Sequence, residues 1–310
     1  MKLIGIFDKS NNFIKSLVII LVPCFLFCFS YTIILLIAKL SGTDLNVIAT
    51  DKSWMEQVQL FTSISVFILG AVVCASLLDK HPFSYISANK SVKIPIYILA
   101  IFCLFFSVPL INFTTEINSQ IHLPDALKEL EDYLRSMEEA SQNMTKLFLS
   151  GNGFKDYLFT IFLMALIPAV GEEFFFRGIL QSYLKSLTNN NHAAIWLTAF
   201  IFSLIHFQFL GFIPRMLLGA LLGYLLVWTG SIWVPIVAHF TNNALAVTGY
   251  WLLQHKYIDV DIDNVGVGDD LIINVLLPTA ILGILLFLLR HLSSSPETGN
   301  PKAWRSLRRK

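Results

Sequence analysis

The sequence predicts an all-α membrane protein, a bundle of about eight transmembrane helices with both termini in the cytoplasm. Hydrophobic residues make up 55% of the 310 residues and charged residues only 14%, whereas soluble domains contain about 25% charged residues. The mean hydropathy is +0.66. Long apolar runs also recur along the chain, and a helix needs roughly 20 such residues to cross about 30 Å of hydrocarbon. These three observations define the fold class.

Each apolar run that approaches this length is predicted to form one membrane span. The runs are 17–40, 60–78, 94–113, 157–187, 193–207, 212–228, 232–253 and 271–289. The fourth run is long and the fifth is short, so a tilted or partly re-entrant segment is possible there. We read 17–40 as a retained anchor, because it is too long for the apolar part of a cleavable signal peptide.

Basic residues set the predicted orientation, because cytoplasmic loops are enriched in Lys and Arg. They gather in the N-terminal segment, in the loop 79–93 and in the tail after Arg290. In a model with eight spans, all three segments lie on the cytoplasmic side. Acidic residues collect in 114–156 and 259–270, which would lie on the opposite side.

The loop after the third span contains an amphipathic helix that begins near Pro124. Leu127, Leu130, Leu134 and Met137 form one stripe, and most acidic residues lie elsewhere on the helix. We expect a surface helix that covers the bundle; the alternative is an element that binds a partner. The four cysteines, Cys24, Cys28, Cys74 and Cys103, fall in apolar runs and are expected to be small buried hydrophobes.

The fourth run contains three ionisable residues, Glu172, Glu173 and Arg177, in the segment IPAVGEEFFFRGILQ. An ionisable side chain at this depth costs roughly 2.5 to 3.5 kcal/mol, so a function or a compensating network is needed. At about 100° per residue, Glu173 and Arg177 share a helix face and can pair, whereas Glu172 points away and is left for chemistry. The alternative is a structural network of salt bridges between helices.

Two polar pairs follow in later runs. Phe202 and His206 are four residues apart, which places an aromatic ring beside an imidazole. His239 and Asn243 have the same spacing and form a pair of donors suited to a developing oxyanion. Each pair could instead serve packing and hydrogen bonding between helices. Glu172, His206 and His239 are all predicted near mid-membrane, and this shared depth favours catalysis over a structural role.

These motifs resemble a known family. The patterns EExxxR at Glu172, FxxxH at Phe202 and HxxxN at His239 are similar to the three ordered motifs of the CPBP (CAAX protease and bacteriocin-processing, or Abi) intramembrane proteases, which include the type II CAAX prenyl endopeptidases. The resemblance covers about 157–250. We therefore divide the chain into 1–156, three spans and the acidic extracytoplasmic helix; 157–253, a protease-like catalytic core; and 254–310, the last span and a basic cytoplasmic tail.

The resemblance implies an endopeptidase in which Glu172 and His206 activate the attacking water. It implies that His239 and Asn243 stabilise the oxyanion, while Glu173, Arg177 and Phe202 support them. We expect no cofactor. Glu172, His206 and His239 could also bind Zn²⁺, although the sequence has no HExxH motif.

Other function classes remain open at this stage. A polytopic transporter could use the same buried groups to move protons or cations, and a catalytically silent member of the same fold is also possible. The expected substrate is a membrane-associated peptide or protein, possibly a prenylated C-terminal CAAX sequence. The expected location is the bilayer, most simply a bacterial cytoplasmic membrane, and the near-zero net charge of +1 argues against a nucleic-acid partner.

Overall fold

A computed structural model describes residues 3–151, 153–259, 265–266, 268 and 270–293. Throughout these residues the chain forms helices and turns without a β-strand, which confirms the predicted all-α class. The helices are α1 (Asn12–Leu40), α2 (Leu45–Thr50), α3 (Lys52–Ser63), η1 (Ile64–Leu69), α4 (Gly70–Leu78), α5 (Pro82–Tyr85), α6 (Ile94–Ser119), η2 (Asp125–Leu127), α7 (Lys128–Leu149), α8 (Phe154–Thr160), η3 (Ile161–Leu166), α9 (Ile167–Glu172), η4 (Glu173–Leu180), α10 (Gln181–Thr188), α11 (Asn191–Leu204), α12 (Phe212–Thr229), α13 (Trp233–Gln254), η6 (Ile272–Leu276) and α14 (Leu277–Ser293).

Within the described residues, six continuous helical stretches are long and apolar enough to cross a membrane. They are Asn12–Leu40, Lys52–Leu78, Ile94–Ser119, Phe154–Thr188, Phe212–Thr229 and Ile272–Ser293. Of the other two predicted spans, α11 has only 14 residues. The other one, α13, is long enough with 22 residues, but it is not among the six because polar side chains such as His239 and Asn243 lower its hydropathy. The protein is a multi-pass membrane protein, and the count of eight spans stays a prediction.

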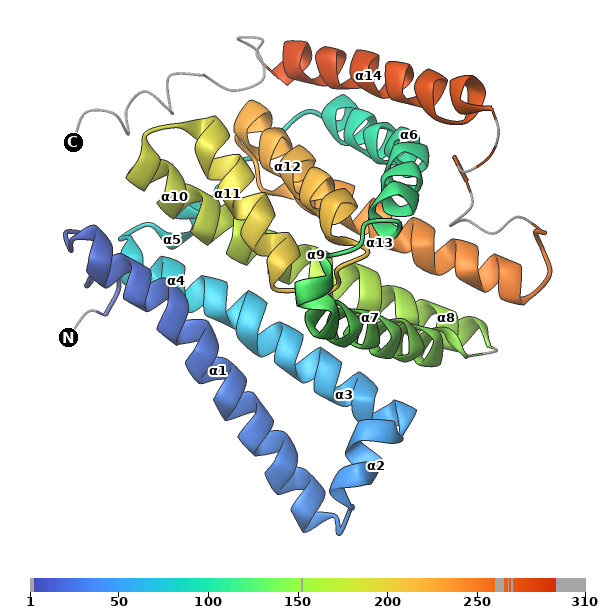
Figure 1. Cartoon of the computed structure of the whole chain (residues 1–310). Helices are drawn as coiled ribbons and strands as arrows, with labels where there is room; N and C mark the ends of the chain where they lie inside the picture. Colours follow the sequence, from blue (N-terminus) through green and yellow to red (C-terminus); the bar gives the residue numbers. More distant parts are fainter. Residues whose placement is uncertain (1–2, 152, 260–264, 267, 269, 294–310) are drawn as a thin grey trace.

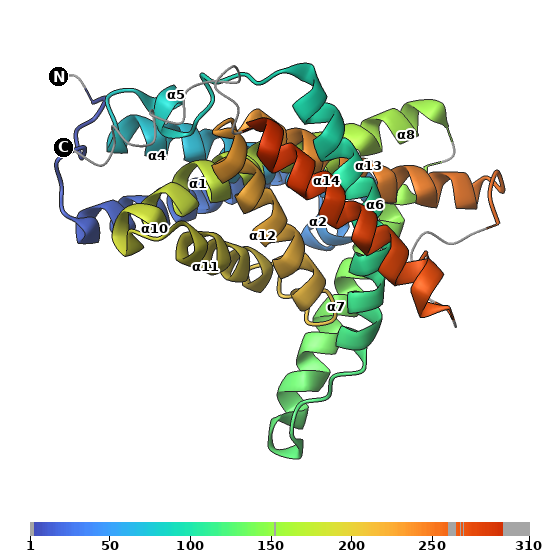
Figure 2. The same ribbon diagram turned by 90° about the horizontal axis from the view of Figure 1, so that it is seen from above.

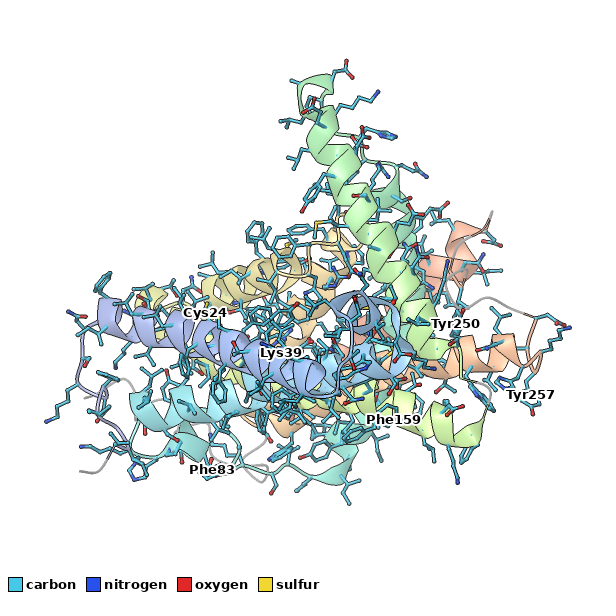
Figure 3. The ribbon with its side chains drawn as sticks, turned by 90° about the horizontal axis from the view of Figure 1, so that it is seen from below. Cys24, Lys39, Phe83, Phe159, Tyr250 and Tyr257 are labelled. Carbon is cyan, nitrogen blue, oxygen red and sulfur yellow. The ribbon has the colours of Figure 1, made fainter. Side chains whose placement is uncertain are left out.

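The outer helices present apolar side chains to their surroundings, as expected for contact with lipid. On α1, Leu21 is 58% and Phe25 67% exposed. Cys24 lies on α1 among these outward-facing side chains (Figure 3). The expectation of four buried cysteines is therefore wrong for Cys24 and Cys28, which are exposed because α1 packs by only one face; Cys74 and Cys103 are buried.

Two groups of helices hold the bundle together (Figure 1). In one group α6 packs against α12, α13 and α14, around buried side chains such as Leu104, Leu222 and Leu225. In the other, α1 and α4 pack against η4, around Leu78, Ile179 and Cys74. The long stretch from α8 to α10 runs between the two groups and contacts α4 on one side and α11, α12 and α13 on the other. Its polar residues are consequently enclosed by helices from both halves of the chain.

The N-terminal segment packs against the end of α4 and the loop that follows it. The Gly5 backbone N–H donates to the Ser76 carbonyl at 2.7 Å, and Lys80 pairs with Asp8 at 3.7 Å. Two of the three basic segments used to predict the orientation thus lie together. The basic residues of the tail, Lys302 to Lys310, lie outside the described residues, and the cytoplasmic location of both termini stays a prediction.

The acidic loop forms a helical hairpin in which the end of α6 and α7 stand out from the bundle (Figure 2). The expected burial of the leucine stripe is wrong at two positions, since Leu127 is 45% and Leu130 47% exposed. Buried positions on α7 include Glu131 and Glu138 instead. The reason is geometric: the part of the hairpin that stands clear of the bundle leaves Leu127 and Leu130 uncovered. The two carboxylates accept hydrogen bonds from backbone N–H groups of loops, Glu131 from Leu123 and Glu138 from Leu210.

Glu131 illustrates how this hairpin is closed. Its carboxylate accepts hydrogen bonds from the Leu123 backbone N–H at 2.7 Å and from Arg135 Nε at 2.8 Å, and it lies 2.9 Å from His122 Nδ1. The pKa of Glu131 is lowered to about 2, because three hydrogen bonds stabilise its ionised form. The largest effect comes from the Leu123 N–H, followed by Arg135 and His122. The hairpin is therefore held by a carboxylate that stays charged above about pH 4.

Candidate active site

The site lies on the fourth span, where the helix passes from α9 into the π-helical segment η4 at Glu172 and Glu173. A wider π-helical turn is uncommon and is often found at functional sites. Pro168 lies one turn before, and because it has no N–H it cannot donate to the carbonyl of Met164 four residues earlier. The Asn243 Nδ2 group donates to that carbonyl at 3.3 Å. The proline thus creates an acceptor that ties α13 to the span.

Glu173 and Arg177 form the predicted ion pair, and both side chains are completely buried. Arg177 Nη1 lies 2.8 Å from Glu173 Oε1, and Nη2 donates to the Gly219 carbonyl at 3.1 Å. A Cβ at Gly219 would lie 3.2 Å from Ala199, so the glycine allows α11 and α12 to approach closely. Gly223, one turn later, likewise lies close to α11, since a Cβ there would be 3.0 Å from Ile195. The close approach at Gly219 leaves a backbone carbonyl available to the guanidinium.

Phe202 connects the charged pair to both histidines. Arg177 Cζ lies 4.7 Å from the centre of the Phe202 ring, within the range of a cation–π contact. The His206 ring meets Phe202 edge-on at 4.8 Å, as the spacing of four residues predicts, and the His239 ring meets it at 6.2 Å. One aromatic side chain thereby sets the relative positions of a guanidinium and two imidazoles.

His239 lies between the two glutamates. Its Nδ1 is 2.8 Å from Glu173 Oε1, and its Nε2 is 3.9 Å from Glu172 Oε2. An ionised carboxylate only accepts hydrogen bonds, so Nδ1 carries the proton and donates to Glu173. The ring is thus fixed with Nε2 directed toward Glu172. The sequence did not predict that Glu173 would hold His239, because the two residues are 66 positions apart.

Glu172 is the less buried of the two carboxylates. Its side chain is 15% exposed, whereas that of Glu173 is 0% exposed. Its contact within 4 Å is His239 Nε2, and the described residues show no shorter polar contact to it. Glu172 therefore keeps acceptor sites for another molecule, which is consistent with the free carboxylate expected from helix geometry.

His206 lies just beyond the C-terminus of α11 rather than on the helix, since α11 ends at Leu204. Its Nδ1 is 2.6 Å from the Phe202 carbonyl. A carbonyl oxygen can only accept, so Nδ1 is the protonated nitrogen and Nε2 of the neutral ring carries the lone pair. The next residue, Phe207, has a positive φ of 52°, which turns the chain into the loop that leads to α12.

The Asn243 amide is oriented by two contacts. Its Nδ2 donates to the Met164 carbonyl, and its Oδ1 accepts from Asn242 Nδ2 at 3.2 Å. One hydrogen on Nδ2 remains for a third partner. His239 and Asn243 share one face of α13, as predicted, but each is already engaged on one side by the fourth span.

A loop contact that the sequence did not reveal joins the site to the acidic hairpin. Glu138 Oε2 of α7 accepts from the Leu210 N–H at 3.2 Å, and Ser141 bonds to Gln208, which in turn accepts from Arg215. These residues carry no motif at local spacing. The only signal for Arg215 in the sequence is a lone arginine inside an apolar run.

A metal ion bound by Glu172, His206 and His239 requires the three side chains to converge. Among the described residues, no group of three His, Cys, Asp or Glu side chains has the arrangement to hold a metal ion together. The expectation of no cofactor and the zinc alternative both stay predictions, and the chemistry below is derived from the protein side chains.

The same part of the chain matches known proteins. Residues 154–245 match the family model of the type II CAAX prenyl endopeptidase Rce1-like proteins. The chain is 35% identical over 89 residues to the uncharacterized protein YpbD of Bacillus subtilis, covering 27% of this chain and 42% of that relative. It is 23% identical over 216 residues to the membrane-embedded CAAX protease MroQ of Staphylococcus aureus, covering 60% of this chain and 86% of the relative. No solved structure matches.

The family model and the MroQ match confirm the resemblance predicted from the three motifs. The matched segment begins three residues before the predicted core and ends two residues after Asn243. It contains all four residues of the candidate site, Glu172, His206, His239 and Asn243.

Proposed function

We propose that the protein is an intramembrane endopeptidase that hydrolyses a peptide bond near the C-terminus of a membrane-associated protein or peptide, with prenylated CAAX sequences as one candidate class of substrate. One observation carries the proposal: Glu172 keeps free acceptor sites beside His239 Nε2, within the segment that matches the CAAX endopeptidase family. The membrane of a bacterium is the proposed location, in keeping with the organisms of the two relatives.

Glu172 acts in this proposal as the general base. It accepts a proton from a water molecule, whose oxygen attacks the carbonyl carbon of the scissile bond. The lone pair on His206 Nε2 accepts a second hydrogen bond from the same water and orients it. Glu172 then returns the proton to the leaving amide nitrogen. The products are a new C-terminal carboxylate and a free amine, so the atoms balance with water as the only co-reactant.

His239 and Asn243 stabilise the tetrahedral intermediate. Asn243 contributes the Nδ2 hydrogen that its bond to Met164 leaves free. His239 donates through Nε2, which requires a doubly protonated ring because Nδ1 already donates to Glu173. The carboxylate of Glu173 attracts that positive charge, and Arg177 holds Glu173 in place through their ion pair. Each of the four motif glutamates and histidines then has a distinct task.

The test is a comparison of membrane peptides from cells that contain the wild-type protein or the Glu172→Gln variant. The substitution keeps the size of the side chain and removes its charge. We expect a small set of C-terminally shortened membrane proteins or peptides in the wild type and the intact forms in the variant. Identical peptide sets would count against a protease. A change in the uptake of ions or solutes without a change in peptides would favour the transporter alternative.

A further inference from the structure

Arg215 carries a charge that the proposed mechanism does not use. It lies in the first turn of α12, and its Nη2 donates to Gln208 Oε1. Its Nη1 is buried and has no hydrogen-bond partner. The described part of the chain also provides no ion pair within 4 Å of its guanidinium, in contrast to Arg177. A sheltered guanidinium with no carboxylate in direct contact is costly, so Arg215 would gain from a further anion bound beside it.

The guanidinium lies close to the candidate site. It interacts electrostatically with Glu172 and His206, and also with Glu138 of α7. Arg215 is thus a cation within electrostatic range of the proposed general base, on the helix α12 that follows the loop carrying His206. A substrate that reaches Glu172 comes within range of this charge.

The loop around Arg215 is fixed by other helices. Asn118 of α6 donates to the carbonyls of Phe209 and Leu210 at 2.7 and 2.8 Å. Ser141 of α7 bonds to Gln208, the residue that accepts from Arg215. The position of the guanidinium is therefore determined before any ligand binds, and pre-organisation of this kind lowers the entropy lost on binding.

Gly211 provides the space that the guanidinium occupies. A Cβ at Gly211 would lie 2.9 Å from Arg215 Nη2 and 3.4 Å from Cζ. Its φ of −95° is open to any residue, so the absence of a side chain matters for space and not for backbone conformation. The planar guanidinium lies against this bare backbone. An alanine there would move the charge without removing it.

We propose that Arg215 binds a carboxylate of the substrate, either its C-terminal carboxylate or an acidic side chain beside the scissile bond. The inference rests on the proposed endopeptidase function. A guanidinium presents two parallel N–H groups that match a carboxylate, and the buried Nη1 donates no hydrogen bond within the described residues. Because Arg215 and Glu172 are fixed relative to each other, the distance between them determines which peptide bond lies over Glu172. This arrangement selects bonds a short way from a carboxylate.

The experiment compares three reporter peptides that share one cleavable sequence. The first has a free C-terminal carboxylate, the second a C-terminal amide, and the third a C-terminal amide with an added acidic residue beside the scissile bond. A hydrogen-bonded charge is worth about 1.5 to 3 kcal/mol, so loss of the recognised carboxylate should lower kcat/KM by about 10- to 100-fold in the wild type. We call the kcat/KM for the peptide with the recognised carboxylate, divided by that for the peptide without it, the carboxylate ratio. In the Arg215→Gln variant this ratio should be close to one.

Two variants and one control distinguish binding of a carboxylate by Arg215 from a purely structural role. Arg215→Lys keeps the charge but not the paired N–H groups of the planar guanidinium. Its ratio should lie between that of the wild type and that of Arg215→Gln. Gly211→Ala displaces the guanidinium and should reduce the ratio as well. Arg135→Gln removes an arginine of α7 that bonds to Glu131, and should leave the ratio at the wild-type value. The melting temperature of each variant shows whether the fold is kept.

The outcomes are distinguishable. If the wild type cleaves the amide peptide more slowly than the free-carboxylate peptide, the C-terminal carboxylate is the ligand. If those two are cleaved at the same rate and only the peptide with the added acidic residue is cleaved faster, the ligand is a side-chain carboxylate. A purely structural Arg215 would lower the rates for all peptides equally and leave the ratio unchanged, which overturns the inference. Cleavage of the three peptides at one rate by the wild type would overturn it as well. If the wild type cleaves none of them while the comparison of membrane peptides also shows no difference, the proposed function fails and this inference fails with it.

Discussion

The Arg177→Met substitution should destabilise the protein strongly, because it breaks a completely buried ion pair. Methionine keeps an unbranched apolar side chain at this position and removes the guanidinium together with its contact to Phe202. Glu173 would lose the nitrogen 2.8 Å from its Oε1, and the Gly219 carbonyl would lose its donor at 3.1 Å. Removal of one partner from a buried pair typically costs about 3 to 5 kcal/mol, since the other charge is left uncompensated.

The expected shift of the melting temperature follows from the size of the chain. An unfolding entropy of about 2.1 cal/mol/K per residue gives roughly 0.65 kcal/mol/K for this length, so a loss of about 3 to 5 kcal/mol corresponds to about 5 to 8 °C. The assay is thermal unfolding of the purified protein in one detergent. The control is Gln181→Ala. Gln181 lies one turn after Arg177 on the same span, and its uncharged amide donates to the Gly223 carbonyl of α12. The cost of this substitution should be about 1 kcal/mol, or about 1 to 2 °C.

A double variant makes the reasoning refutable. Glu173→Gln combined with Arg177→Met leaves no buried charge in the pair, and should recover much of the stability lost by Arg177→Met alone. The reasoning fails if Arg177→Met melts within about 2 °C of Gln181→Ala, or if the double variant is no more stable than the single one.

Three further predictions concern orientation, the acidic hairpin and the oxyanion. Reporter fusions within 84–92 should report the cytoplasm and fusions at Gln142 the opposite side, because basic residues mark the cytoplasmic loops; a cytoplasmic result at Gln142 would overturn the eight-span topology. The lowered pKa of Glu131, about 2, means that its stabilisation is complete above about pH 5 and is lost as the pH falls toward 2. The protection of the α7 amides, measured against the intrinsic exchange rate at each pH, should therefore fall on acidification, and Glu131→Gln should remove this dependence; an unchanged protection profile would contradict the assignment. His239→Ala and Asn243→Ala should each lower kcat by about 10²- to 10³-fold without a comparable rise in KM, and a change confined to KM would exclude the oxyanion role.

Features with local spacing were predictable from the sequence. The Glu173–Arg177 pair and the Phe202–His206 contact both follow from residues four positions apart. The existence of the long helices followed from their apolar length. The three motifs together identified the family that the comparisons support.

Features that join distant segments were not predictable in the same way. No periodicity connects His239 to Glu173, or Arg215 to the acidic hairpin. The Asn243 contact had one usable signal, since a proline at position 168 cannot donate the α-helical hydrogen bond to the carbonyl at 164. The leucine stripe on α7 was misleading because amphipathicity shows which face is apolar, and not whether another helix covers it.

The most direct test of the central claim is hydrolysis of a reporter peptide by the purified protein, with and without a strong chelator, in the wild type and in Glu172→Gln. If Glu172 activates water as a base, the wild type should cleave the peptide at nearly the same rate in the chelator. The variant should be inactive while it keeps the wild-type melting temperature. Normal turnover by Glu172→Gln would remove Glu172 as the base. Loss of wild-type activity in the chelator, with recovery on addition of Zn²⁺, would instead make Glu172, His206 and His239 ligands of a metal.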